Sequence, residues 1–126
     1  MKLQLNILEN FFTIHRFPAN HKIPNQVYES PFYSISKTDE ELSIVCDSTT
    51  QVNSDNSDAG WSCIKVEGPL DFSLTGILAK ISTVLAEAKI SIFAISTFDT
   101  DYILVKSENL PFAKKVLLKS GYTFNH

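Results

Sequence analysis

The order of hydrophobic patterns in the second half of the chain most constrains its fold. Residues 62–67 alternate apolar and polar side chains, which is typical of a strand, and the pattern stops at Gly68 and Pro69. A helical pattern follows, in which apolar residues recur at intervals of three and four. They are Ile77, Ile81, Val84, Leu85 and Ala88. Because these positions share one helix face, we expect an amphipathic helix with one buried side, capped at its start by Ser73 or Thr75.

A strand pair and a second helix complete this half. Residues 91–98 are apolar on both faces, which predicts a strand in the centre of a sheet. A short polar connection, residues 99–101, joins them to residues 102–106, so the two segments form a hairpin. Asn109 is expected to cap a second helix with Pro111 in its first turn, and Gly121 occupies the position of a left-handed residue at its end. A last short strand follows at residues 122–124.

The resulting order is strand, helix, strand, strand, helix, strand. This is the βαββαβ order of the ferredoxin-like folds. We therefore predict an α+β domain over residues 60–126, with an antiparallel sheet and two helices on one of its faces.

The first half, residues 1–59, is a weaker copy of the same pattern. It contains three strand-like segments, at residues 11–17, 32–36 and 42–46, and room for only a short helix at residues 24–28. The run 47–60 is polar and rich in turn-forming residues, which predicts an exposed linker. We expect a degenerate half-repeat that joins or packs on the second half.

Composition excludes several functions. The net charge is −3, and no cluster of Lys or Arg exceeds a pair, which argues against nucleic-acid binding. No apolar run is long enough to span a membrane, and the N-terminus lacks the features of a signal peptide. Cys46 and Cys63 lie in or beside apolar strands, so buried free thiols are expected rather than a disulfide or a catalytic cysteine. These features favour a cytoplasmic protein.

Neither catalysis nor metal binding has a motif in this chain. His15, His21 and His126 do not form a zinc-ligand spacing with the cysteines, and His15 is expected to be a half-exposed structural residue on a strand. The aspartates between residues 47 and 60 do not fit a calcium-binding loop, and no nucleophile or phosphate-binding motif occurs. We predict no enzyme activity, no catalytic residue, no metal and no cofactor.

The helix start and the hairpin together carry a family resemblance. The segments 74–79, 88–92 and 95–105, which include the run Ile-Ser-Thr-Phe-Asp-Thr-Asp-Tyr, resemble the ACT domain. Within that family the chain is most similar to small tandem-ACT proteins related to the CASTOR arginine sensors and to the regulatory ends of aspartate kinases. The hairpin at residues 38–46 is similar to the first repeat of the same group.

The resemblance implies a regulatory module that binds an amino acid where two ACT domains meet. It assigns backbone contacts to Gly76 and Ile77, with Thr75 at the tip of the preceding loop. It assigns ligand contacts on the following strand to Ser91 and Ile92, and an acidic position near the cationic group of the ligand to Asp101. It also implies a homodimer and a regulated protein partner.

Elementary chemistry is consistent with these roles but leaves alternatives. A helix start offers free N–H groups and partial positive charge to a carboxylate, and Asp101 or Asp99 offers a partner to an ammonium group. Gly76 could instead be a packing glycine, and the two aspartates could serve only the turn. The alternative function is therefore a ligand-free ACT-fold scaffold for interaction or oligomerisation.

Overall fold

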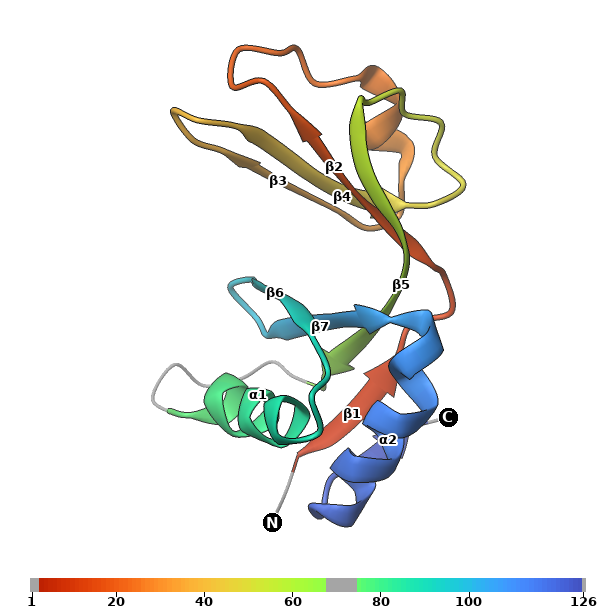
Figure 1. Cartoon of the computed structure of the whole chain (residues 1–126), viewed down its shortest axis with the longest axis vertical. Helices are drawn as coiled ribbons and strands as arrows, with labels where there is room; N and C mark the ends of the chain where they lie inside the picture. Colours follow the sequence, from red (N-terminus) through yellow and green to blue (C-terminus); the bar gives the residue numbers. More distant parts are fainter. Residues whose placement is uncertain (1–2, 68–74, 126) are drawn as a thin grey trace. The chain divides into compact units, whose positions relative to one another are not determined.

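The computed structural model describes residues 3–67 and 75–125, and the chain divides into two compact units (Figure 1). The helical unit comprises residues 1–9 and 62–126, and the β unit comprises residues 10–61. Strand β5 (Asn56–Val66) runs through the boundary, so its first part belongs to the β unit and its last part to the helical unit. Each unit is described by itself.

The helical unit contains the predicted βαββαβ order. After β5 come α1 (Ile77–Glu87), β6 (Ile92–Ser96), β7 (Asp101–Lys106), the 3-10 turn η2 (Ser107–Asn109), α2 (Leu110–Lys119) and β8 (Thr123–Asn125). The α+β class and the element order are thus confirmed. The predicted strand stop at Gly68 and Pro69, and the loop at residues 71–74 with the candidate cap Ser73, lie outside the described residues.

An additional strand makes this sheet mixed instead of wholly antiparallel. Strand β1 (Gln4–Ile7) lies between β5 and β8, antiparallel to β5 and parallel to β8, and the strand order is β6-β7-β5-β1-β8. Leu5 of β1 is fully buried and stands between Val66 and Phe124 in the register. The strand is recruited because its alternating pattern offers apolar side chains to the same core as its neighbours.

The central position predicted for residues 91–98 is wrong. Strand β6 pairs with β7 and stands at the end of the strand order. Apolar residues on both faces of a strand indicate that both faces are covered by other parts of the protein. They do not indicate whether one or both of its edges pair with another strand. The hairpin prediction itself is confirmed, since β6 and β7 are antiparallel from the Ile92–Val105 pair to the Ser96–Asp101 pair.

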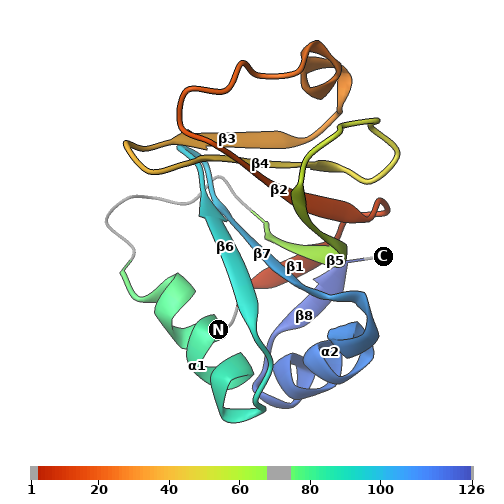
Figure 2. The ribbon, with the colours of Figure 1, turned by 45° about the horizontal axis from the view of Figure 1, so that its top comes forward.

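Helices α1 and α2 contact each other and supply the apolar cover of the sheet (Figure 2). The predicted face of α1 is confirmed, because Ile81 and Leu85 are fully buried and Ile77, Val84 and Ala88 pack around them. One buried cluster of this unit, against which the helices pack, comprises Leu5, Ile64, Val66, Ile81, Leu85, Ile90, Ile103, Val105, Ala113, Leu117, Tyr122 and Phe124.

The two helices end with the same backbone geometry but with different residues. After α1, the N–H of Ile90 donates to the carbonyl of Leu85, and the N–H of Lys89 donates to that of Ala86. After α2, Tyr122 and Gly121 make the equivalent bonds to Leu117 and Leu118. This is the Schellman motif, whose left-handed position is Gly121 in α2, as predicted, and Lys89 with φ of 61° in α1.

The β unit is a small antiparallel sheet. Its elements are β2 (Phe12–Phe17), the 3-10 turn η1 (Asn25–Glu29), β3 (Tyr33–Lys37), β4 (Leu42–Asp47) and the first part of β5, in the order β3-β4-β2-β5. The three predicted strands and the short helix are all present. Because β5 begins at Asn56, it also takes in the end of the predicted polar linker. Its polar residues there are exposed while their backbone pairs with Ile14, His15 and Arg16 of β2.

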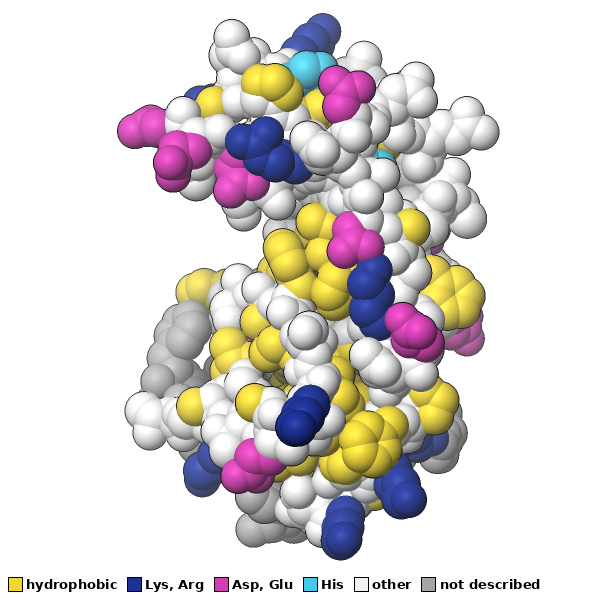
Figure 3. Space-filling model, in the orientation of Figure 1, with side chains coloured by type: hydrophobic (Ala, Val, Ile, Leu, Met, Phe, Trp, Pro, Cys, Tyr) yellow, Lys and Arg dark blue, Asp and Glu magenta, His cyan; other side chains and the backbone are white. Residues whose placement is uncertain are grey.

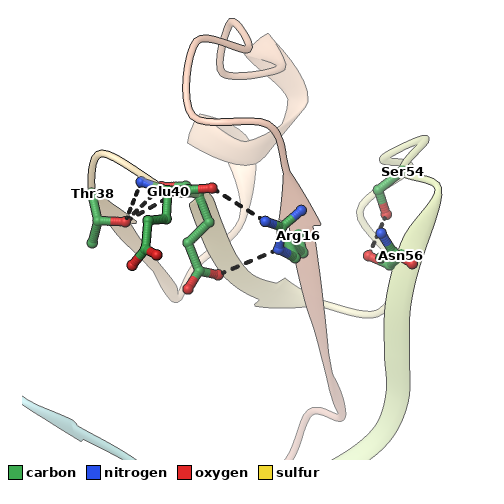
Figure 4. A network of polar contacts seen from close by, with 6 residues as sticks. Arg16, Thr38, Glu40, Ser54 and Asn56 are labelled. Atoms are coloured by element: carbon green, nitrogen blue, oxygen red, sulfur yellow. Dashed lines mark hydrogen bonds and ion pairs between the residues drawn. The ribbon is translucent and has the colours of Figure 1, made fainter.

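Hydrogen bonds between polar side chains join the strands and loops of the β unit. The buried carboxylate of Asp47 accepts bonds from Asn10 Nδ2 at 2.5 Å and from the N–H and hydroxyl of Thr49, each at 2.8 Å. At the exposed end of the sheet, Arg16 donates to the carbonyl of Glu40 at 3.2 Å and lies 3.9 Å from Glu41 (Figure 4). Polar contacts therefore accompany apolar packing throughout this unit.

Candidate functional site

Gly76 stands at the start of α1 because of its backbone conformation. It is the N-terminal cap of the helix with φ of 76°, a region that side chains rarely adopt, and its carbonyl accepts the first helical bond from Lys80 N at 2.9 Å. Among the described residues, no atom lies within 4 Å of the position where a Cβ would be added. The left-handed turn therefore accounts for the glycine, and packing against the described residues does not.

The helix start is accessible to a ligand. Thr75 and Gly76 are exposed, while Ile77 is half-buried against the core. In the part of the chain that the structure describes, no side chain caps the helix, so the predicted capping by Thr75 is wrong. The first N–H groups of an α-helix have no partner within the helix itself. These groups and the partial positive charge of the helix start are suited to a carboxylate.

Asp101 lies at the first position of β7 and is held by the hairpin. Its carboxylate accepts a hydrogen bond from Ser96 Oγ at 2.6 Å, across the strand pair. The neighbouring Thr100 is buried, and its hydroxyl donates to the carbonyl of Val66 at 2.6 Å, which ties the hairpin to the end of β5. The sequence reasoning missed the role of Ser96, although its place opposite Asp101 in a short hairpin would have signalled it.

Ser91 and Ile92 lie at the other end of α1. The chain leaves the helix at Glu87, turns through Lys89, and enters β6 at Ile92. Ser91 is exposed, and Ile92 packs against the core. An eleven-residue helix is about 16 Å long at 1.5 Å per residue. One copy of the unit therefore brings Thr75, Gly76 and Ile77 together but keeps Ser91 and Ile92 a helix length away.

The cysteines and His15 are buried. No cluster of His, Cys, Asp and Glu in the described residues could hold a metal ion. Both cysteines are free and buried, as predicted, and burial raises the pKa of the Cys63 thiol to about 12, which favours the protonated thiol at neutral pH. His15 is buried, not half-exposed as expected, and its Nδ1 lies 2.7 Å from Ser54 Oγ.

The basic side chains that the structure describes are distributed on the surface as the sequence predicted, without a cluster. On the face shown in Figure 3, basic side chains are scattered, some of them beside acidic ones, and form no continuous patch. Among the described residues, no helix has the length and apolar character that crossing a membrane requires.

Comparison with known families identifies the chain. A family model described as the ACT domain matches residues 56–119, slightly more than half of the sequence. The chain belongs to the ACT domain family. A second family model, of an N-terminal domain, matches residues 10–55, which coincides closely with the β unit. The resemblance drawn from the helix start and the hairpin is thereby confirmed.

Curated relatives include arginine sensors. The cytosolic arginine sensor for mTORC1 subunit 1 of Pongo abelii is 31% identical over 120 residues, which cover 88% of this chain and 36% of the relative. The human protein of the same name is 34% identical over 94 residues. The chain thus spans about a third of the length of the curated relatives that it matches.

Solved structures share the whole fold. The Agrobacterium tumefaciens protein Atu0741 is 37% identical and superposes with a TM-score of 0.91, covering 99% of this chain and 93% of the other. The structure of aspartokinase alpha and beta subunits has a TM-score of 0.64 at 16% identity, over 94% of this chain and 97% of that one. The latter likeness supports the ACT-like fold alone.

Proposed function

We propose that this protein is a regulatory module that binds a small amino acid at the interface between two ACT domains. The observation that carries the proposal is the exposed start of α1, where Gly76 adopts a left-handed conformation with open space around it. The α-carboxylate of the ligand takes the N–H groups after Gly76. The carboxylate of Asp101 takes its ammonium group, with Thr75 and Ile77 flanking the site.

A second copy of the chain supplies Ser91 and Ile92. Within one copy these residues are a helix length from Gly76. If two β6 strands pair antiparallel about a two-fold axis, Ser91 of one copy comes to the helix start of the other. The segment Ile92–Ser96 supports this pairing, because it is an edge strand without a charged residue to block it. The functional protein is then a homodimer with two equivalent sites.

The names of the curated relatives suggest a regulatory role and a cytoplasmic location for this protein. Proteins named as cytosolic arginine sensors match most of this chain, and we infer a cytoplasmic, non-enzymatic regulator with a protein partner. We further propose that the first half is a degenerate ACT-like half whose linker leads into the ACT domain at residue 60. The identity of the amino acid follows from a screen of all twenty.

Thermal unfolding of the full chain tests ligand binding. A ligand that binds only the folded state stabilises it by RT ln(1 + [L]/Kd), about 2.7 kcal/mol at a hundredfold excess over Kd. We expect one or a few amino acids to raise the melting temperature. The absence of a shift with every amino acid at millimolar concentration would contradict the proposal.

A pair of glycine variants locates the site. Gly60 and Gly76 both have positive φ and both have open space where a Cβ would lie. Gly60→Ala and Gly76→Ala should therefore cost similar stability, about 1 kcal/mol. Only Gly76→Ala is expected to abolish the melting shift that the ligand of the interface site produces. Equal loss in the two variants would show that the effect is general destabilisation.

An edge variant tests the dimer. Ala94 is exposed on β6, and a lysine there places a charge on the proposed pairing edge. We expect Ala94→Lys to yield a monomer in sedimentation and to lose amino-acid binding at the interface site. Ser36→Lys on β3, an edge strand of the β unit, is the matched control and should change neither.

A ligand-free scaffold is the second candidate, favoured by the same uncharged edge at β6. It predicts that the chain assembles through this edge while no amino acid affects its melting. Under that function Gly76→Ala leaves assembly intact, whereas Ala94→Lys abolishes it.

A further inference from the structure

A cavity of about 410 Å³ lies in the helical unit, away from the start of α1. It is lined by the ends of two parallel strands and by the side of α2, through the residues Asn6, Ile7, Leu8, Glu9, Lys114, Phe124 and Asn125. None of the six residues assigned to amino-acid binding lines it. Its volume falls within the range of small-molecule pockets.

The lining combines an apolar floor with opposite charges. Ile7 and Leu8 are half-buried, and Phe124 is almost fully buried. The ammonium group of Lys114 lies 5.5 Å from the centre of the Phe124 ring, a cation–π contact that holds the charge beside the apolar floor. The carboxylate of Glu9 and the amides of Asn6 and Asn125 also line the cavity.

These polar groups are available to a ligand. Among the described residues, the side chains of Asn6, Glu9, Lys114 and Asn125 make no hydrogen bond or ion pair with the rest of the protein. The cavity therefore offers one cation, one anion and two amides beside an apolar surface. A carboxylate complements Lys114, an ammonium group complements Glu9, and an aliphatic group complements Phe124.

We propose that this cavity is a second ligand site, which takes a zwitterion with an apolar side chain, such as an apolar amino acid. Its carboxylate pairs with Lys114 and its ammonium group with Glu9, while its side chain covers Ile7 and the Phe124 ring. The proposal goes beyond the interface site, because it needs neither Gly76 nor a second copy of the chain.

Nuclear magnetic resonance of the full ¹⁵N-labelled chain tests the proposal with L-leucine as the probe. The expected result is a saturable shift of the side-chain amides of Asn6 and Asn125. 4-Methylpentanoate lacks the ammonium group and isoamylamine lacks the carboxylate, so each should bind at least about tenfold more weakly. Shifts confined to residues 76–80, or no shift at all, would overturn the proposal.

Matched variants separate the cavity from general charge effects. Lys114→Gln removes the cation over the ring, and Lys115→Gln removes the next, exposed lysine of the same helix. Lys114→Gln and Glu9→Gln should each weaken leucine binding about tenfold, whereas Lys115→Gln should leave it unchanged. Equal weakening by the two lysine variants would refute the site. Gly76→Ala should leave these shifts in place, so the cavity and the interface site fail or succeed independently.

Discussion

The two units of this chain bury hydrophobic and polar side chains in different proportions. Among the described residues, the helical unit buries fourteen hydrophobic side chains, twelve of them in the cluster under its two helices. The β unit buries eight, of which Phe17, Val27, Leu42, Ile44 and Cys46 form the cluster against η1. Four of the six buried polar residues in the described parts of the chain lie in the β unit: Thr13, His15, Ser30 and Asp47. Each makes a side-chain hydrogen bond there.

The difference follows from the available secondary structure. Two amphipathic helices cover a sheet face with apolar side chains, but the β unit has only a 3-10 turn and loops. Loops carry backbone and side-chain polar groups that must find partners when they are buried. We expect the helical unit to depend mainly on packing and the β unit to depend also on hydrogen bonds.

The largest loss of stability is expected when a buried side chain of the helical core is shortened. Leu85 is fully buried between α1 and the sheet. Leu85→Ala should lower the free energy of unfolding by about 2–5 kcal/mol, because the packed surroundings cannot collapse around the missing methyl groups. Urea unfolding measures it. A loss below about 1 kcal/mol would show that this core is loosely packed.

A smaller loss of stability is expected when the hydrogen-bond network around Asp47 in the β unit is broken. Asp47→Ala leaves the donors of Asn10 and Thr49 without their acceptor, so we expect a loss of about 1–3 kcal/mol. Asp47→Asn keeps an acceptor oxygen and should cost less. If the alanine variant unfolds in urea like the natural protein, the network does not stabilise this unit.

A gain in stability is expected at the end of α1. Lys89 is exposed and adopts the left-handed conformation that Gly121 adopts after α2. Lys89→Gly should raise the free energy of unfolding by about 0.5–1 kcal/mol, since glycine has no Cβ to strain the turn. Gly121→Ala is the inverse control and should lower it by a similar amount. Thermal and urea unfolding measure both, and a destabilised Lys89→Gly variant would contradict the account.

The smallest expected effect is a loss of folding stability at acidic pH, caused by the buried His15. Burial lowers the pKa of His15 from its ordinary value of 6.5, so below pH 6.5 the unfolded chain binds more protons than the folded chain. The contribution of the neutral imidazole is fully present above pH 6.5. It is lost as the pH falls from there through the lowered pKa. His15→Gln should reduce the loss of stability between pH 7 and pH 5, and an unchanged pH profile would contradict this role.

Local patterns predicted most elements because their causes are local. The spacing of Ile81 and Leu85 defines a buried helix face. Gly121 adopts a left-handed backbone conformation that strains residues with a Cβ. The hairpin between β6 and β7 likewise follows from a short polar turn between two apolar segments. These predictions needed no knowledge of the rest of the chain.

The candidate site was predicted less completely. The sequence predicts Gly76 and Asp101 as site residues, but the left-handed turn at Gly76 and the bond from Ser96 to Asp101 are facts of three-dimensional geometry. The family resemblance that assigns Ser91 to the same ligand says nothing about its distance from Gly76. The length of α1 separates the two residues in one copy, so the proposed site needs a second copy.

By itself the sequence determined the βαββαβ order of the second half, the ACT resemblance and the buried face of α1. Only the tertiary structure decided that β1 lies between β5 and β8, that β6 is an edge strand, and that Lys114 stands over Phe124. The physical reason is the range of the interactions. Side-chain periodicity and turn conformation act between neighbours in sequence, whereas strand pairing and cavity lining join residues more than a hundred positions apart, such as Leu5 and Phe124.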